Sequence, residues 1–462
     1  MTRTQDILSE RADRGIRLIR TTRSICQSCH RELPAHMVVK QGKVFLEKMC
    51  PGHGDRTILL SSDPEYLCDL IDAYFTLVPE NLPLKILEIA LTSRCSFSCP
   101  ICSSTSIRNT INDLTVEEVT KIVQENRSKE IMLWGLEATE HPDLEAIIRA
   151  MRKLGKNPYL FTNGFKLADY EYIEKLHKAG LSHVHMQFDG FEEKIYQTLR
   201  GRGLLENKLR AFDNLKRLGI ATCLNVTLAK GVNEHQIGPL LRYCVQNDFI
   251  KQIGFLPLIR VGDAESCSPE MVPHLHESLS IIEKETQGRI KVDSLRIFQK
   301  FMYVVYRFTK FRRCFWFTLY VLIKDKKRAD YITLDEVIDF KRLDAVVTKY
   351  ISGCKKEPGI FNDFRLLSNL IPLFLHRKVL SLVLGFLAFI ISGNKIRHLR
   401  FGGNLLWLTC VDFCDPYKMD LDMAEKYCEE ILAMKKGRDV VYGRTYDAAL
   451  GICAFHRENP ST

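Results

Sequence analysis

The chain has 462 residues, of which 46% are hydrophobic and 26% are charged. This composition is that of a globular protein of roughly two or three domains, and it excludes a disordered chain. The formal net charge of +10 suits an acidic surface or an anionic membrane, but a basic globular protein with no such partner carries the same charge. We expect no nucleic-acid partner.

The first 25 residues contain no apolar core of the kind that marks a secretory signal. The sixteen cysteines of the chain therefore indicate a reducing compartment and metal ligation rather than a disulfide scaffold. We expect a cytoplasmic protein, and leave peripheral contact with a membrane open.

Residues 22–62 form a small cysteine-bearing unit, and residues 84–260 alternate short apolar runs with amphipathic helical patterns. The apolar runs cover 86–91, 131–134, 158–161, 183–188, 221–228 and 253–258. Strand candidates separated by helices predict parallel β/α units in an open or closed barrel. In such barrels the chemistry lies at the carboxyl ends of the strands.

A loop with three cysteines follows the first strand candidate. Cys95, Cys99 and Cys102 are spaced by four and then three positions, and no fourth cysteine is near them. Disulfides need pairs, and a tetrahedral zinc site needs four ligands. Three thiolates can instead ligate three irons of a [4Fe–4S] cluster and leave the fourth iron open to a substrate or cofactor.

Residues 290–462 differ in composition from the preceding region. The segment 298–327 mixes aromatic with basic residues, and 366–393 contains an uninterrupted apolar run from Val379 to Ser392. This run is too short to span a bilayer comfortably. One interpretation is a buried core helix, and the other is a wall for a hydrophobic substrate or a surface that lies on lipid.

The cysteine loop resembles the signature of the radical S-adenosylmethionine (radical SAM) enzymes. Residues 134–139 resemble the family's Gly-Gly-Glu-Pro-Thr motif, with Leu136 and Ala138 at the second glycine and the proline. The segments 161–164 and 187–190 end the third and fourth strands as in many members. The resemblance implies an α/β fold, a partial (β/α)6 TIM-like barrel over residues 84–260.

The resemblance also implies the cofactor chemistry. Cys95, Cys99 and Cys102 would ligate a [4Fe–4S] cluster, and SAM would bind its open iron. One electron from the reduced cluster would cleave SAM to a 5′-deoxyadenosyl radical, which removes hydrogen from unactivated carbon. The residues implied in SAM binding lie at strand ends: Gly135, Glu137, Thr162, Asn163, Gln187 and Asp189.

Each of these assignments has an alternative. A glutamate or aspartate at a strand end is often only a helix cap or a surface charge. The three cysteines could belong to a zinc site that borrows His141 or Cys223.

The N-terminal unit resembles the rubredoxin-like or zinc-ribbon-like domain of one subgroup. That subgroup contains tetraether lipid synthases, ring-forming synthases of archaeal-type lipids and proteins described as dihydropterin methylases. Cys26, Cys29 and Cys50, with His53 as the fourth ligand, would hold a mononuclear iron or zinc ion. His30 and His36 are near enough in sequence to compete with His53.

The C-terminal part, residues 290–462, resembles the subgroup's cysteine-rich region. The implied ligands of one auxiliary [4Fe–4S] cluster are Cys314, Cys410, Cys414, Cys428 and Cys453. Buried thiols without metal are the alternative. A second auxiliary cluster would need Cys267 or Cys354, and we do not expect one.

Taken together, the sequence predicts a radical SAM enzyme that acts on an sp³ carbon of a hydrophobic molecule. A lipid alkyl chain is the expected substrate, with carbon–carbon coupling, ring closure or methylation as outcomes, and a reductase or ferredoxin-type protein as the electron donor. The alternatives are a methyltransferase acting on a pterin and a non-catalytic iron–sulfur electron carrier. An electron carrier would normally supply a fourth cysteine ligand.

Overall fold

The protein is represented by a computed structural model that describes residues 15–79, 86–105, 108, 111–309, 315, 317–356, 359–374, 404–411, 417–423, 430–436 and 439–443. Four of the cysteines predicted as auxiliary-cluster ligands, Cys314, Cys414, Cys428 and Cys453, lie outside the described residues, as does the apolar run 379–392.

The N-terminal unit is an antiparallel sheet with the strand order β1-β2-β3-β4. Its strands are β1 (Arg17–Ile25), β2 (Glu32–Lys40), β3 (Lys43–Cys50) and β4 (Gly54–Ser61). The β1–β2 and β3–β4 turns lie at the same end of this meander, because alternate connections of an antiparallel sheet share an end. The cysteines carried by these two turns therefore meet.

Helix α2 (Pro64–Leu77) joins this unit to the rest of the protein. Asp63 caps the helix by accepting a hydrogen bond from the backbone N–H of Tyr66, and Pro64 occupies the first turn, where a missing N–H costs nothing. The ring of Tyr74 lies 5.0 Å from the ring of Tyr303 on α10 (Val292–Thr309).

The centre of the protein is a sheet in which six parallel strands are neighbours in chain order. These strands are β5 (Ile86–Thr92), β6 (Glu130–Gly135), β7 (Asn157–Thr162), β8 (His183–Gln187), β9 (Ala221–Leu228) and β10 (Ile250–Pro257). Their positions match the six predicted strands. The α/β fold with a partial six-stranded barrel is therefore confirmed.

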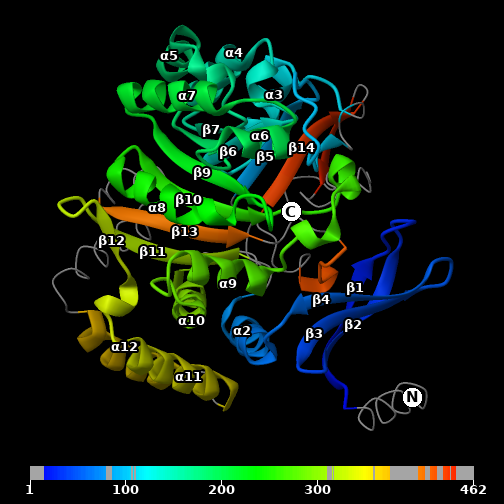
Figure 1. The fold of residues 1–462 in the computed structure, drawn as a ribbon, viewed down its shortest axis with the longest axis vertical. Coiled ribbons are helices and arrows are strands. Elements are labelled where there is room, and N and C mark those ends of the chain that lie inside the picture. Colours follow the sequence, from blue (N-terminus) through cyan, green and yellow to red (C-terminus); the bar gives the residue numbers. More distant parts are fainter. Residues whose placement is uncertain are drawn as a thin grey trace.

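Helices connect the barrel strands and cover one face of the sheet (Figure 1). They are α3 (Val116–Glu125), α4 (Leu144–Lys153), α5 (Tyr170–Ala179), α6 (Glu193–Arg200), α7 (Leu205–Leu218), α8 (Ile237–Gln246) and α9 (Leu275–Glu285). Short 3₁₀ turns occur at Ala138–Glu140, Lys166–Ala168, Glu234–Gln236, Gly262–Ser266, Pro269–Met271 and Leu334–Glu336.

Strands from the C-terminal third extend both edges of the barrel sheet. On one side β13 (Leu405–Val411) pairs with β10, followed by β11 (Phe317–Asp325) and β12 (Asp330–Ile332). On the other side β14 (Glu430–Lys436) pairs with β5, followed by β15 (Asp439–Gly443). Figure 1 shows β14 beside β5 and β13 between β10 and β11. The described strands beyond residue 290 thus continue the barrel sheet.

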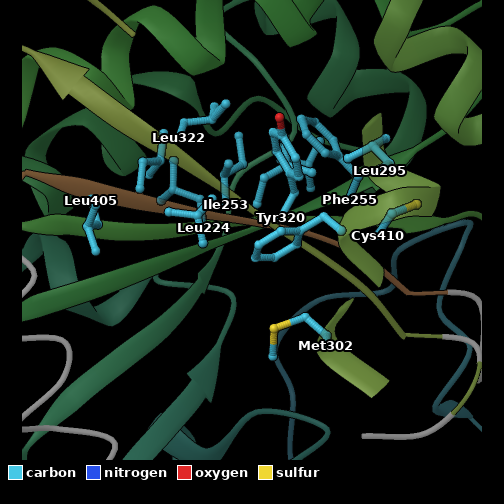
Figure 2. Packing of buried hydrophobic residues seen from close by; sticks show 14 of the residues in the cluster. Leu224, Ile253, Phe255, Leu295, Met302, Tyr320, Leu322, Leu405 and Cys410 are labelled. Atoms are coloured by element: carbon cyan, nitrogen blue, oxygen red, sulfur yellow. The ribbon is translucent and has the colours of Figure 1, made fainter. Parts of the chain in front are cut away.

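Two further helices, α11 (Phe340–Lys356) and α12 (Ile360–Phe374), lie side by side at the margin of the molecule (Figure 1). The main hydrophobic core lies between the sheet and the helices packed on it, and Figure 2 shows the part near α10, where Phe255, Leu295, Tyr320 and Cys410 pack together. Among the described helices, none combines the length and apolarity that crossing a bilayer requires.

Candidate active site and metal centre

The three-cysteine loop leaves the carboxyl end of β5 and is fixed at its base. Thr92 donates a hydrogen bond from Oγ1 to Asp113 Oδ1 over 2.6 Å, and the backbone N–H of Ser96 donates to Glu140 over 2.9 Å. The backbone N–H of Cys102 donates to the carbonyl of Cys99 over 3.1 Å. All three thiols are partly exposed, so the loop presents them on the expected face of the barrel.

These thiols are not arranged for a single metal ion. A zinc ion about 2.3 Å from each sulfur needs ligand sulfurs roughly 4 Å apart. A cubane cluster lies between its thiolates, so its ligand sulfurs are further apart than those of a single ion. Among the described residues, the one group of potential ligands whose atoms all lie within 4.8 Å of one another is in the N-terminal unit. The alternative of a zinc site completed by His141 or Cys223 is therefore not formed.

Without a metal, the loop favours protonated thiols. Burial raises the pKa of Cys95 to about 12 and also raises the pKa of Cys102. A cationic group bound to the sulfurs would offset this penalty, because metal ligation requires the thiolate. Three thiols on a loop with room between them thus fit an iron–sulfur cluster.

Gly135 brings the end of β6 against the base of the cysteine loop. Its φ angle is +142°, and a β-carbon there would lie 2.3 Å from the carbonyl oxygen of Thr92. The same oxygen accepts a hydrogen bond from the backbone N–H of Leu136 over 3.1 Å. A side chain at residue 135 would therefore push the two strand ends apart.

Glu137 is buried and ties the end of β6 to the end of β7. Its Oε1 accepts hydrogen bonds from Thr139 Oγ1 over 2.7 Å and from Thr162 Oγ1 over 2.5 Å, and its Oε2 accepts from the backbone N–H of Asn163 over 2.7 Å. Burial raises the pKa of Glu137, and these donors lower it. Glu137 also caps the 3₁₀ turn Ala138–Glu140 by accepting from the backbone N–H of Thr139 over 3.1 Å, so the helix-cap alternative is observed, and the same carboxylate also positions the neighbouring strand end.

Asp189, just after β8, is the centre of a second network. Both carboxylate oxygens accept from the guanidinium of Arg200, at 2.8 and 3.0 Å, and one also accepts from the backbone N–H of Thr227 over 3.0 Å. Gln187 donates to the same carboxylate through its side-chain amide. Burial would lower the pKa of Arg200, but the Asp189 carboxylate raises it. This bidentate pair joins the ends of β8 and β9.

Lys208 is a buried lysine that the sequence analysis missed. From α7 its Nζ donates to the carbonyl oxygens of Asn163, over 2.6 Å, and Gln187, over 2.8 Å, and to Gln187 Oε1 over 2.5 Å. Burial lowers its pKa to about 7. Lys208 shares the buried face of α7 with Ala211, Phe212 and Leu215, at helical spacing. A lysine among apolar residues at helical spacing is the sequence signal that could have identified this buried residue.

The barrel sheet has two different faces. The side chains that point toward the helices, such as Leu133, Leu160 and Leu224, are buried. The alternate positions form what we call the inner face, and many of its side chains are partly exposed. They include Met132, Trp134, Phe161, His185, Gln187, Thr227, Gln252, Leu256, Leu319 and Trp407. The inner face, below the cysteine loop, is therefore aromatic and polar, with apolar residues toward β10 and β11.

The N-terminal unit holds the group of ligands noted above: Cys26, Cys29, Cys50 and His53. The sulfurs of Cys29 and Cys50 are 3.7 Å apart, and His53 Nδ1 lies 3.4 Å from the sulfur of Cys50. Burial opposes ionisation of Cys26, but backbone N–H groups of Cys29 and Ser28 lower its pKa to about 6. These distances fit a closed tetrahedral iron or zinc site.

The two competing histidines have other contacts. His30 Nε2 lies 3.3 Å from the hydroxyl of Tyr417, and His36 Nδ1 lies 3.5 Å from the hydroxyl of Thr21. The structure therefore brings His53, and neither His30 nor His36, to the three cysteines.

Comparison with known protein families agrees with this geometry. Residues 18–62 match the HMPTM N-terminal zinc ribbon domain, and residues 89–244 match the radical SAM superfamily. The chain contains a radical SAM domain. The cysteine loop and the strand ends described above lie within it, and the predicted ribbon and barrel are both confirmed.

Relatives of the radical SAM domain are named as enzymes. The chain is 31% identical over 301 residues to the 7,8-dihydro-6-hydroxymethylpterin dimethyltransferase of Methanocaldococcus jannaschii, covering 58% of this chain and 59% of that protein. It is 28% identical over 217 residues to the GTP 3′,8-cyclase of Staphylococcus saprophyticus, covering 44% and 62%. The chain thus spans less than two thirds of either relative.

Solved structures with similarity include Streptococcus suis SuiB bound to S-adenosylmethionine, with 18% identity, a TM-score of 0.35 and coverage of 50% of this chain and 48% of that chain. Methylornithine synthase (PylB) has 15% identity, a TM-score of 0.36 and coverage of 52% and 74%.

The auxiliary cluster beyond the radical SAM domain stays a prediction. Of its candidate ligands, Cys410 is within the described residues, on β13, and its side chain is buried on the helix-facing side of the sheet (Figure 2). Cys354 accepts a hydrogen bond from Asn362 over 3.3 Å, and the partly exposed Cys267 packs against a cluster that includes Ile101 of the cysteine loop. The described residues form no second cluster around either.

Proposed function

We propose that the protein is a radical SAM enzyme that removes a hydrogen atom from a carbon of a substrate held against the inner face. With SAM and a [4Fe–4S] cluster bound at Cys95, Cys99 and Cys102, one electron from a ferredoxin-type or reductase donor yields methionine and a radical that takes hydrogen from carbon. The position of the cysteine loop, at the first strand end and above the partly exposed inner face, carries this proposal.

The strand-end residues then act as a frame for SAM. The carboxylates of Glu137 and Asp189 already accept hydrogen bonds from protein donors, and the Thr162 hydroxyl and the backbone N–H of Asn163 already donate to Glu137. We therefore expect Gly135 and its neighbours to contact SAM mainly through backbone groups, with Gln187 at the inner face. The side chains of Glu137 and Asp189 would hold that backbone in place.

A reduced pterin is the substrate that the inner face supports best. A flat heterocycle with amide and amine groups needs aromatic surface for stacking and side chains that both donate and accept hydrogen bonds. Trp134 and Phe161 supply the aromatic surface, and the partly exposed Gln252 supplies a group that both donates and accepts. The relative from Methanocaldococcus jannaschii is named for a pterin substrate. Methylation of a pterin carbon is the reaction proposed here. Hydrogen abstraction leaves a carbon radical, which takes the methyl group of a second SAM molecule while a second electron from the donor leaves S-adenosylhomocysteine.

A lipid alkyl chain is the second candidate, and a different observation favours it. Helix α12 exposes Ile360, Phe361, Phe364, Leu367 and Ile371, each by 50% to 90%. The nearby Lys355, Lys356 and Arg365 add positive charge. An apolar helix face edged by basic side chains is typical of contact with a membrane surface, where a lipid substrate would be found.

The test is anaerobic turnover of reconstituted enzyme with SAM and a reductant. One arm contains 7,8-dihydro-6-hydroxymethylpterin and the other a bacterial and archaeal lipid extract, and mass spectrometry follows 5′-deoxyadenosine and substrate. We expect 5′-deoxyadenosine in both arms and a mass gain of 14 Da, one methyl in place of hydrogen, in the pterin only. Loss of hydrogen from lipid alone would assign the second candidate. No 5′-deoxyadenosine in any arm would contradict the proposed function.

A further inference from the structure

The inner face contains a buried amide without a partner. Asn225, on β9, is 7% exposed, and its side-chain Nδ2 has no hydrogen-bond partner. A buried polar group left without a partner costs about 1–3 kcal/mol. Such a group pairs with an ordered water or with a bound molecule, and its place on the inner face makes the substrate a candidate partner.

Asn225 has close neighbours on the next two strands. It is in register with Gly254 of β10, which is in register with Thr409 of β13; we call Gly254 with Asn225 and Thr409 on either side of it the notch. A β-carbon on Gly254 would lie 2.9 Å from Thr409 Oγ1 and 3.4 Å from Asn225 Oδ1. The glycine therefore lets the Thr409 hydroxyl approach the strand, with the Asn225 amide on the other side.

The notch lies deeper than the residues framing SAM. The Asp189 network reaches β9 at the backbone N–H of Thr227, two positions nearer the carboxyl end than Asn225. At a rise of about 3.3 Å per residue, Asn225 is roughly 6.6 Å further into the barrel. A molecule that reached Asn225 would therefore lie beneath SAM, where the substrate belongs.

The neighbouring polar groups define what the notch can bind. Gln252 donates to Thr409 Oγ1 over 3.4 Å, which leaves the Thr409 hydroxyl hydrogen available as a donor. Across the face, Trp134 Nε1 is a second buried N–H without a partner. An alkyl chain would leave all these groups unpaired, whereas an amide-bearing ring offers them acceptors.

We propose that Asn225 and Thr409, on either side of Gly254, form the subsite that binds the cyclic amide edge of the substrate. The Asn225 amide donates to the ring carbonyl and accepts from the adjacent ring N–H, and Thr409 completes the contact. This inference rests on the proposed function and deepens it, because it assigns the substrate class to a flat heterocyclic amide. It makes Asn225 a specificity-determining residue.

The test compares Asn225→Leu with the matched control Asn214→Leu, whose asparagine lies on α7 and donates to the carbonyl of Leu167. Leucine has nearly the shape of asparagine, and replacing a buried polar group by an apolar one of that shape is close to neutral for folding. A second variant, Thr409→Val, is likewise isosteric.

Binding of 7,8-dihydro-6-hydroxymethylpterin is measured by its fluorescence, and SAM binding and uncoupled 5′-deoxyadenosine formation are measured without pterin. We expect Asn225→Leu to weaken pterin binding at least tenfold, Thr409→Val to weaken it several-fold, and both to leave SAM binding within twofold. The control variant Asn214→Leu should leave both pterin binding and SAM binding unchanged. If the wild type binds the pterin but forms no product, the proposed subsite is retained and the proposed methylation is contradicted.

Three results would overturn the inference. Equal loss of SAM binding in Asn225→Leu would place this residue in the SAM site. Unchanged pterin binding in both variants would leave the notch without a role. Faster consumption of lipid by Asn225→Leu than by the wild type would show that the notch faces alkyl chains.

Discussion

Two cysteine sites lie within the part of the chain that the structure describes, and they are built in opposite ways. In the ribbon, four ligand atoms lie within 4.8 Å of one another with no metal present; the pKa of Cys26 is lowered to about 6, and that of Cys29 is raised. The three thiols of the radical SAM loop do not form such a group, and burial raises the pKa of Cys95 to about 12. The chain thus preorganises the ligand atoms of the ribbon for a single ion, and it does not do so in the loop.

The ribbon also has a structural task that the loop lacks. Lys48, buried on β3, donates to the carbonyl oxygens of Ile25, over 2.5 Å, and Tyr417, over 2.7 Å. Arg23 pairs with Asp422 over 2.7 Å, and Thr22 and Arg20 both contact the buried carboxylate of Asp420. The ribbon therefore anchors the segment 417–423, which follows the predicted auxiliary ligands Cys410 and Cys414.

The largest expected effect separates the two sites by metal content. Cys99→Ala should lose about four iron atoms per chain relative to the wild type, with the ribbon ion retained. Cys50→Ala should lose about one mononuclear iron or zinc ion and keep the cluster absorbance. Elemental analysis and ultraviolet–visible spectra of both purified variants check this. Loss of cluster iron from Cys50→Ala would mean that the two sites are not independent.

A smaller effect concerns the anchor. Lys48→Met leaves two buried carbonyl groups without their donor, at a cost of about 1–3 kcal/mol. We expect amide hydrogen exchange in 417–423 to quicken by roughly tenfold, since each 1.4 kcal/mol is a factor of ten, with the ribbon ion still bound. Lys43→Met, at an exposed position of the same strand, is the control. Equal exchange in both variants would remove the anchoring role of Lys48.

The smallest effect is a pH dependence at Lys208. Its pKa is about 7 in the folded protein and near 10.4 in an unfolded chain, so unfolding takes up a proton between these pH values. The free energy of unfolding should therefore rise with pH in this window, by at most about 1.4 kcal/mol per unit, and Lys208→Met should lose this slope. Denaturant unfolding at pH 7.5, 8.5 and 9.5 measures it, with Lys194→Met as control. A slope unchanged in Lys208→Met would contradict the lowered pKa.

The sequence predicted those features of the fold and the sites that local residue patterns determine. Short apolar runs separated by helical patterns identified β5 to β10, and cysteine spacing identified both the loop and the ribbon ligands. It did not predict Lys208, because the contact with Asn163 joins residues from different β/α units. It did not predict the Asp189–Arg200 pair either, because no periodic pattern relates the end of β8 to the end of α6. Nor did it predict that β13 and β14 extend opposite edges of one sheet, since such pairing depends on long-range packing rather than on local propensity. Asn225 lies in a run that the sequence identifies only as an apolar strand, and it is distinguished only by the missing hydrogen-bond partner of its side-chain Nδ2.

The central claim is that the loop performs the chemistry and the ribbon does not. Its most direct test is 5′-deoxyadenosine formation from SAM and dithionite, measured anaerobically on reconstituted wild type, Cys99→Ala and Cys50→Ala. Our account predicts background levels in Cys99→Ala and formation within a few-fold of the wild type in Cys50→Ala. Formation at the wild-type rate in Cys99→Ala would contradict it.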